Sequence, residues 1–275
     1  MANQKNKSHQ KKAESKSSAQ NILLSYKFWL YFIPILSFVL YINTLSHDFV
    51  LDDEAVITKN KFVLQGISGW PSILKTYYWA GYWENYSGLY RPFSLLWFAL
   101  IKQLFGLNPH VFHFLNVLLY SLCSFLLFKL LYTVFKKENL ILSVLITLFF
   151  VVHPMHTEVV ANVKSADELF SFLFFLFSTQ ILVSTQELSL TKKILSAALL
   201  FCALLSKEGA ILFIPAQFIL LWMINPVAII IDDDDDFHIM NVIWRNPISC
   251  GVDVLAKICH RIEIGGGLFL RLFFI

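Results

Sequence analysis

Long apolar segments alternate with short polar ones along most of this chain. The first apolar segment runs from Phe28 to Leu45. Six more follow it, at 93–105, 111–135, 140–155, 167–184, 194–206 and 210–224. Several approach or exceed the roughly 18 apolar residues that a membrane-spanning helix needs. The pattern therefore predicts an all-α fold, a polytopic membrane bundle of about six or seven hydrophobic helices.

Composition agrees with this prediction. Hydrophobic residues make up 57% of the chain and charged residues only 15%, which is far from the balance of a soluble protein. We expect membrane lipid as a partner and no nucleic acid. The first apolar segment is longer than that of a signal peptide, and Ser46-His47-Asp48 behind it lacks a small-x-small cleavage site. It is interpreted as a retained first span.

Lysines predict the orientation. Residues 1–27 carry six lysines against one glutamate and are rich in Ser, Gln and Asn, which is typical of a disordered cytoplasmic tail. Lys136-Lys137 and Lys192-Lys193 lie on the same side as this tail if the short segment 93–105 does not cross fully. The transmembrane region is then 28–224.

In this orientation the polar segments between spans gather on the outer side. They are the long loop 46–92 with Asp52-Asp53-Glu54, the stretch His153–Glu158, and Lys207-Glu208. This gathering is expected of an active site at the extracytoplasmic face. The loop 46–92 is also rich in Trp and Tyr, which suits either an interfacial aromatic belt or a platform that stacks on sugar rings.

Asp52 and Asp53 follow the first span directly. Burial near a helix end and the charge of a neighbouring carboxylate both raise a carboxylate pKa, which suits a general base. The same carboxylates are ordinary metal ligands. A solvated turn that ends the helix is the third interpretation, and the pattern alone does not separate the three. Glu54 is assigned a supporting role in the substrate pocket.

Two cations stand out on the outer side. Arg91 can hold a phosphate by paired hydrogen bonds, or it can anchor the chain at the interface. Lys207 and Glu208 interrupt two apolar segments, so they mark either a tight outer turn or a pair that faces a ligand.

The stretch His153-Pro154-Met155-His156-Thr157-Glu158 follows the 140–155 span. Two histidines and a glutamate could bind zinc, but Pro154 favours a break in the helix, so the spacing is no clean metal motif. We favour polar contacts of His153, His156 and Glu158 with substrate or with neighbouring loops over a metal site. Lys164 with Asp167 or Glu168 is interpreted as an ordinary helical ion pair.

Taken in order, several motifs resemble one family. They are Phe49-Val50-Leu51-Asp52-Asp53-Glu54, Tyr90-Arg91-Pro92, Phe105-Gly106-Leu107-Asn108-Pro109 with His113 and Asn116, His153-Pro154-Met155-His156-Thr157-Glu158, and Ser206-Lys207-Glu208. This series resembles the membrane half of the transmembrane and tetratricopeptide-repeat containing proteins. That family is grouped with the protein O-mannosyltransferases in the GT-C glycosyltransferase superfamily.

The resemblance implies a membrane enzyme that moves a mannose-like sugar from a polyprenyl-phosphate donor to a protein hydroxyl. Asp52 or Asp53 would be catalytic, and Arg91 with Lys207 would hold the donor phosphate. Glu54, His153, His156, Glu158 and Glu208 would line the pocket. In that superfamily the acidic residue of the first outer loop activates the acceptor or binds a metal, so a divalent metal stays an open alternative; no cofactor is firmly predicted.

Residues 225–275 depart from the family. They show no repeat of 34 residues and contain the aspartate run Asp232–Asp236, which is interpreted as solvated and of low complexity. We interpret this tail as atypical, the product of a truncation or a frameshift. A non-catalytic remnant or a scaffold that binds the lipid carrier is therefore the alternative function.

Richness in Phe, Ile, Lys and Asn favours a bacterial inner membrane with the site facing the periplasm; the endoplasmic reticulum membrane is the alternative.

Overall fold

A computed structural model describes residues 25–84, 88–135, 137–183 and 189–224 of the chain. Nearly all of the predicted Lys-rich tail 1–27, and the whole segment 225–275, lie outside the described residues. Within them every regular element is a helix, which confirms the all-α prediction.

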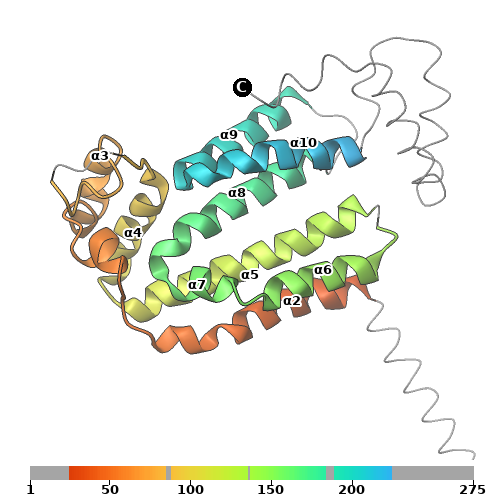
Figure 1. Ribbon diagram of the computed structural model, residues 1–275, viewed down its shortest axis with the longest axis horizontal. Helices are drawn as coiled ribbons and strands as arrows, with labels where there is room; N and C mark the ends of the chain where they lie inside the picture. The colour runs from red at the N-terminus through yellow and green to blue at the C-terminus, as the bar shows by residue number, and fades with distance from the viewer. Residues whose placement is uncertain (1–24, 85–87, 136, 184–188, 225–275) are drawn as a thin grey trace, which may run out of the picture. The chain divides into compact units, whose positions relative to one another are not determined.

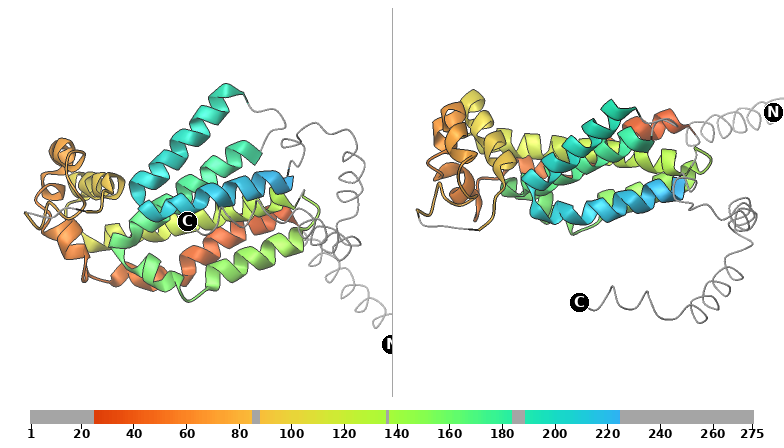
Figure 2. Two further views of the ribbon diagram at one scale, coloured as in Figure 1. Left: turned by 45° about the horizontal axis from the view of Figure 1, so that its top comes forward. Right: turned by 90° about the horizontal axis from the view of Figure 1, so that it is seen from above.

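Six helices form the main bundle (Figures 1 and 2). They are α2 (Tyr26–Leu40), α5 (Pro109–Val134), α6 (Leu140–Val152), α8 (Ala166–Val183), α9 (Leu190–Ser206) and α10 (Phe213–Ile224). α5 contacts α2, α6 and α8, and α8 also contacts α9 and α10. The helices run roughly along one direction, so their ends gather at two ends of the bundle (Figure 1).

The lengths of these helices bear on the predicted spans. In the described part of the chain, two segments, Pro109–Val134 and Val163–Val183, are long and apolar enough to cross a membrane. The apolar helices Tyr26–Leu40, Pro92–Phe105 and Leu140–Val152 are shorter. The number of crossings, predicted as six or seven, therefore stays a prediction.

The first apolar segment is not one continuous helix. α2 ends at Leu40, and the 3-10 helix η1 (Ile42–Ser46) continues the chain. The Thr44 hydroxyl donates to the Tyr41 carbonyl over 2.8 Å, which ties the tighter turn back to the helix end. The predicted segment 28–45 is thus helical in two pieces of different pitch.

The break predicted at Pro154 is confirmed. α6 ends at Val152, and the short helix α7 (His156–Ala161) starts four residues later. A further 3-10 helix, η4 (Val163–Ser165), leads into α8. The stretch between α6 and α8 is therefore a sequence of short turns, and these turns bring polar side chains to the end of the bundle.

The long loop 46–92 is folded rather than extended. It contains the π-helix η2 (Glu54–Thr58), the 3-10 helix η3 (Val63–Gly69) and the short helix α3 (Trp70–Ile73), and it leads into α4 (Pro92–Phe105). The buried Asn60 side chain holds the start of η3, because its Oδ1 accepts from the backbone N–H groups of Phe62 and Val63. α3 and α4 lie at one end of the bundle, at the left of Figure 1.

Close packing joins this loop to α4. Gly66 in η3 has φ +66°, and a Cβ atom there would lie 2.2 Å from the Gln103 side chain of α4. Tyr78 is buried, and its backbone N–H donates to the Leu89 carbonyl over 2.8 Å. Tyr78 is thus part of the core, whereas Tyr77, Tyr82 and Trp83 stay exposed.

Candidate functional site

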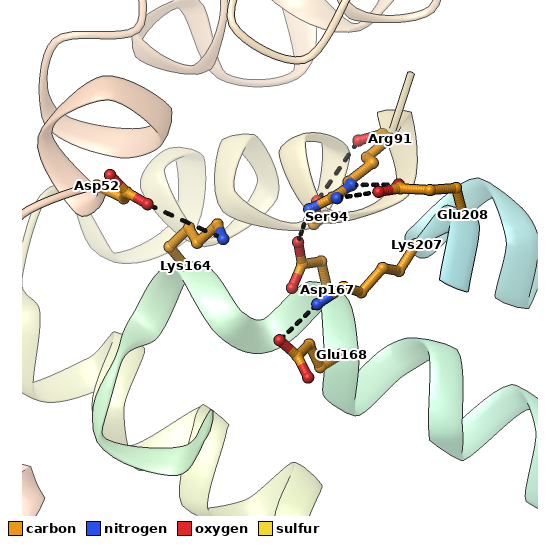
Figure 3. A network of polar contacts seen from close by, with 8 residues as sticks. All are labelled: Asp52, Arg91, Ser94, Lys164, Asp167, Glu168, Lys207 and Glu208. Carbon is orange, nitrogen blue, oxygen red and sulfur yellow. Dashed lines mark hydrogen bonds and ion pairs between the residues drawn. The ribbon is translucent and has the colours of Figure 1, made fainter. Parts of the chain in front are cut away.

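Arg91 is the centre of a polar network at one end of the bundle (Figure 3). It directly precedes α4, and its side chain is only 7% exposed. Its Nη1 donates to Asp167 Oδ2 at the start of α8 over 2.7 Å, and its Nε donates to Glu208 Oε2 over 2.7 Å. Nη2 also donates to the second oxygen of Glu208. The network therefore joins three segments that are far apart in the sequence.

Electrostatics keeps this arginine charged. Burial by itself would lower the Arg91 pKa, but the hydrogen bonds and charges of Glu208 and Asp167 outweigh it and raise that pKa. In return the Arg91 hydrogen bonds lower the pKa of the Glu208 carboxyl. Each partner thus holds the other in its ionised form.

Lys207, adjacent to Glu208, makes a separate ion pair. Its Nζ lies 2.5 Å from Glu168 Oε1 on the first turn of α8. Lys207 and Glu208 follow α9, which ends at Ser206, so this junction contributes both a cation and an anion to the network. Lys207 and Glu208 were predicted to mark either a tight turn or a pair that faces a ligand. In the structure Lys207 contacts Glu168 on α8, and Glu208 contacts Arg91.

The predicted helical ion pair of Lys164 with Asp167 or Glu168 is wrong. Lys164 Nζ lies 4.0 Å from Asp52 Oδ2, while Asp167 and Glu168 pair with Arg91 and Lys207. Lys164 belongs to the 3-10 helix η4 rather than to α8, so the spacing of a regular α-helix does not apply to it.

Asp53 is a structural link at this end of the bundle. It is fully buried. Its Oδ2 accepts from the Val50 backbone N–H over 3.0 Å, and its Oδ1 accepts from the Lys164 backbone N–H over 2.8 Å. Burial raises the pKa of this carboxyl, and the two backbone donors partly offset the increase. Both carboxylate oxygens are thus engaged in holding the loop to the start of α8.

Asp52 differs from its neighbour. Its side chain is 56% exposed, and its contact with Lys164 Nζ is at the 4.0 Å limit of an ion pair. The preceding Leu51 has φ +48°, which is uncommon for a residue with a branched side chain. Asp52 is therefore accessible, unlike the buried Asp53, and it follows a strained backbone position.

Glu54, the third acid, pairs locally. Its Oε2 lies 2.5 Å from Lys59 Nζ, and both side chains are more than half exposed. This pair lies within the loop 46–92. Glu54 has no ion pair with the Arg91 network among the described residues.

Among the described contacts, His153 and His156 pack on aromatic rings and form no ion pair with the network. The His156 ring packs on Phe150, with ring centroids 4.3 Å apart, and on Tyr120 at 5.6 Å. Burial lowers the pKa of His156, and the nearby His153, at 5.9 Å between centroids, lowers it further. Glu158 is exposed on the first turn of α7. In the described part of the chain, no cluster of three or more His, Cys, Asp or Glu side chains suits a metal ion.

Three charged residues of the network, Lys164, Asp167 and Glu168, were not among the predicted site residues. Asp167 is an acid at the start of an apolar segment, a position that is costly without a partner and so indicates a role. Lys164 contributes through its backbone as well as its side chain, for which the sequence carries no signal. Asn116 on α5 holds the end of α7 in place, because its buried amide donates to the Val160 and Asn162 carbonyls.

Comparison with known proteins gives relatives of one kind. The chain is 36% identical over 149 residues to protein O-mannosyl-transferase TMTC2 of Homo sapiens, which is 52% of this chain and 17% of that protein. It is 35% identical over 141 residues to protein O-mannosyl-transferase TMTC1 of Homo sapiens, or 50% of this chain and 16% of the relative. With protein O-mannosyl-transferase Tmtc1 of Drosophila melanogaster it shares 32% identity over 182 residues, 64% of this chain and 20% of the relative.

These similarities confirm the family resemblance that the motifs indicated. In each of these three cases the match spans a fifth of the relative or less. No family model and no solved structure matches the chain.

Proposed function

We propose, from this resemblance and from the network around Arg91, that the chain carries the site of a GT-C membrane glycosyltransferase. The substrate would be a mannose-like sugar on a polyprenyl phosphate, and the acceptor a protein hydroxyl. The names of the relatives support a protein O-mannosyltransferase. The observation that carries the proposal is the single cluster of an accessible carboxylate, a buried arginine and two lysines at one end of an apolar bundle.

Asp52 is the proposed general base. Transfer requires the acceptor hydroxyl to attack the anomeric carbon while the bond to the lipid phosphate breaks. The hydroxyl proton passes to the Asp52 carboxylate, and the departing phosphate keeps the bonding electron pair. A base must be reachable by substrate, and Asp52 is half exposed whereas Asp53 is buried with both oxygens engaged. This difference assigns the two carboxylates different roles.

Asp53 and Lys164 are positioning residues in this scheme. The Asp53 carboxylate holds the backbone of Lys164, and the Lys164 ammonium lies next to Asp52. Together they fix the loop that carries the base to the start of α8. Glu54 stays a candidate for the substrate pocket at the outer edge of the same loop.

Arg91 and Lys207 are the proposed ligands of the donor phosphate. A guanidinium binds phosphate oxygens in pairs, and a lysine adds a point charge. Both cations would stabilise the negative charge that develops on the departing lipid phosphate. Glu208, which contacts Arg91, would then line the pocket at the donor side, and His153, His156 and Glu158 would line it on the side of α7.

The apolar bundle suits a substrate that stays in the lipid. A polyprenyl chain would lie among lipid tails, and its phosphate would reach the polar end of the helices. We propose a multi-pass topology with this end outside, in a bacterial inner membrane facing the periplasm or, alternatively, in the endoplasmic reticulum membrane.

The test is transfer of labelled mannose from a polyprenyl-phosphate donor by the purified chain in lipid nanodiscs. Asp52→Asn should abolish transfer without weakening donor binding, because only the proton acceptor is lost. Glu138→Gln is a matched control, since it neutralises an exposed acid in the loop between α5 and α6. Retained transfer in Asp52→Asn would refute the assignment. Donor binding without any transfer by the unmodified chain would instead favour the lipid-carrier-binding scaffold.

A further inference from the structure

The two carboxylates on Arg91 are not equivalent. Asp167 is fully buried and contacts one guanidinium nitrogen. The Glu208 side chain is 56% exposed and contacts two, Nε and Nη2. If Asp167 moved away, both it and Arg91 would be left as buried charges without a partner, whereas the Glu208 carboxylate can rotate to face solvent. Arg91 therefore has one fixed partner and one that can be exchanged.

Glu208 occupies the edge of the guanidinium that suits an incoming anion. The parallel N–H groups of Nε and Nη2 bind a carboxylate and a phosphate in the same bidentate manner. Nη1 stays on Asp167 in either case, so the arginine keeps its position while the other partner changes. The remaining edge is thus a preformed anion site with a glutamate on it.

The backbone around Glu208 allows this exchange. Lys207 is extended, with φ −154° and ψ 132°, and Glu208 starts the 3-10 helix η5 (Glu208–Leu212). The Glu208 side chain is more than half exposed. Its carboxylate can therefore move without displacing core side chains, while Lys207 stays on Glu168.

Charge makes the exchange necessary. The network contains the three cations Arg91, Lys164 and Lys207 against the four carboxylates Asp52, Asp167, Glu168 and Glu208. A phosphate that approached the closed cluster would meet an excess of negative charge and an occupied arginine. Removal of Glu208 from Arg91 frees two donors and leaves the remaining charges balanced.

We propose that Glu208 is a built-in competitor of the phosphate ligand, which closes the Nε/Nη2 edge of Arg91 until a lipid-linked phosphate takes its place. The proposal rests on the phosphate-binding role given to Arg91 above. It adds that Glu208 occupies the site when no phosphate is bound. The affinity for phosphate is then set by the strength of the Arg91–Glu208 pair. Asp167 is the positioning residue that keeps Arg91 in place during the exchange.

The test is direct binding to the purified full chain in detergent, with a short-chain polyprenyl phosphate as the probe. Glu208→Gln should tighten binding about three- to tenfold, the effect expected when a partly exposed, bidentate ion pair no longer competes. Inorganic phosphate should also bind more tightly to this variant, while the affinity for the uncharged polyprenol should not change. Glu138→Gln, the matched loss of an exposed charge, should leave all three affinities unchanged. Arg91→Lys in the Glu208→Gln background should remove the gain, because lysine offers no bidentate edge.

Unchanged or weaker binding of both phosphate probes to a folded Glu208→Gln variant overturns the proposal. A gain for inorganic phosphate but not for polyprenyl phosphate also overturns it, because the ligand is then not lipid-linked. An equal gain in affinity for polyprenol overturns it too, since the substitution would then act on the apolar chain and not on the phosphate. Unfolding temperatures of each variant establish that the fold is intact. Because this assay requires no sugar transfer, a tighter-binding variant of an inactive chain would refute the proposed enzyme and leave the exchange standing.

Discussion

Asp53→Asn and Asp52→Asn are expected to differ in their effect on stability, although the two residues are adjacent. The Asp53 carboxylate is fully buried and accepts two backbone N–H groups, from Val50 at 3.0 Å and from Lys164 at 2.8 Å. An asparagine amide has one oxygen, so its NH₂ group must face one of these two donors. The substitution therefore breaks a charge-assisted hydrogen bond and leaves a backbone N–H without an acceptor.

The expected cost follows from these contacts. A hydrogen bond to a charged group contributes about 1.5–3 kcal/mol, and an unsatisfied buried donor costs about 1–3 kcal/mol. These two contributions overlap, and the loss of a buried charge offsets part of them. We expect Asp53→Asn to lower the free energy of unfolding by about 2–3 kcal/mol. Asp52→Asn removes a half-exposed side chain with one distant partner and should stay within about 0.5 kcal/mol.

The assay is SDS-induced unfolding of each variant in mixed micelles, together with mannose transfer measured on the same preparations. Asp53→Asn should lose stability, and its transfer should fall through disorder of the loop. Asp52→Asn should keep its stability and lose transfer. Hydrogen exchange at the Lys164 amide should speed up in the first variant alone. Equal stability of the two variants, or a larger loss in Asp52→Asn, would refute the roles assigned to the two acids.

Three further predictions concern the same end of the bundle. Asp167→Asn should lower the unfolding free energy by about 3 kcal/mol, because it leaves the buried Arg91 short of a charged partner; a loss below about 1 kcal/mol in SDS unfolding would contradict this. Burial raises the pKa of folded Asp53, so the folded chain binds this proton more tightly than the unfolded chain. Its contribution to stability should fall as pH rises from about 3.9, the unfolded value, through the folded pKa, and this fall should be absent from an Asp53→Asn titration. Gly66→Ala should destabilise the chain by about 1–3 kcal/mol, because φ +66° disfavours any side chain and the new Cβ would meet Gln103; Gly209→Ala, in open space, is the control in thermal unfolding.

The elements were largely predictable because the signals for them are local. Runs of apolar residues predicted each helix of the bundle, and Pro154 predicted the break between α6 and α7. Helix ends were less accurate: the segment 28–45 divides after Leu40 into α2 and the turn η1. Over a single turn, hydropathy does not separate an α-helix from a 3-10 helix, because their repeats of 3.6 and 3.0 residues differ by less than one residue.

The sequence predicted which segments carry the candidate site, but not which of its side chains pair with one another. Residues on loops that share one side were expected to gather, and Asp52, Arg91 and Glu208 do lie at one end of the bundle. Lys164 was assigned to the wrong partners, because its neighbours in sequence are not its neighbours in space. His153 and His156 were predicted to contact substrate or neighbouring loops, and the His156 ring packs on Phe150.

The sequence by itself determined that this is an all-α chain of apolar helices with its acids and cations between them, since hydrophobic patterning is a local property. Only the tertiary structure decided which acid is accessible and which is buried. Asp52 and Asp53 have identical side chains and adjacent positions, and they differ only in what the fold packs around them. The pairing of Arg91 with Asp167 and Glu208 is likewise a property of the fold, because it joins segments 76 and 117 residues apart.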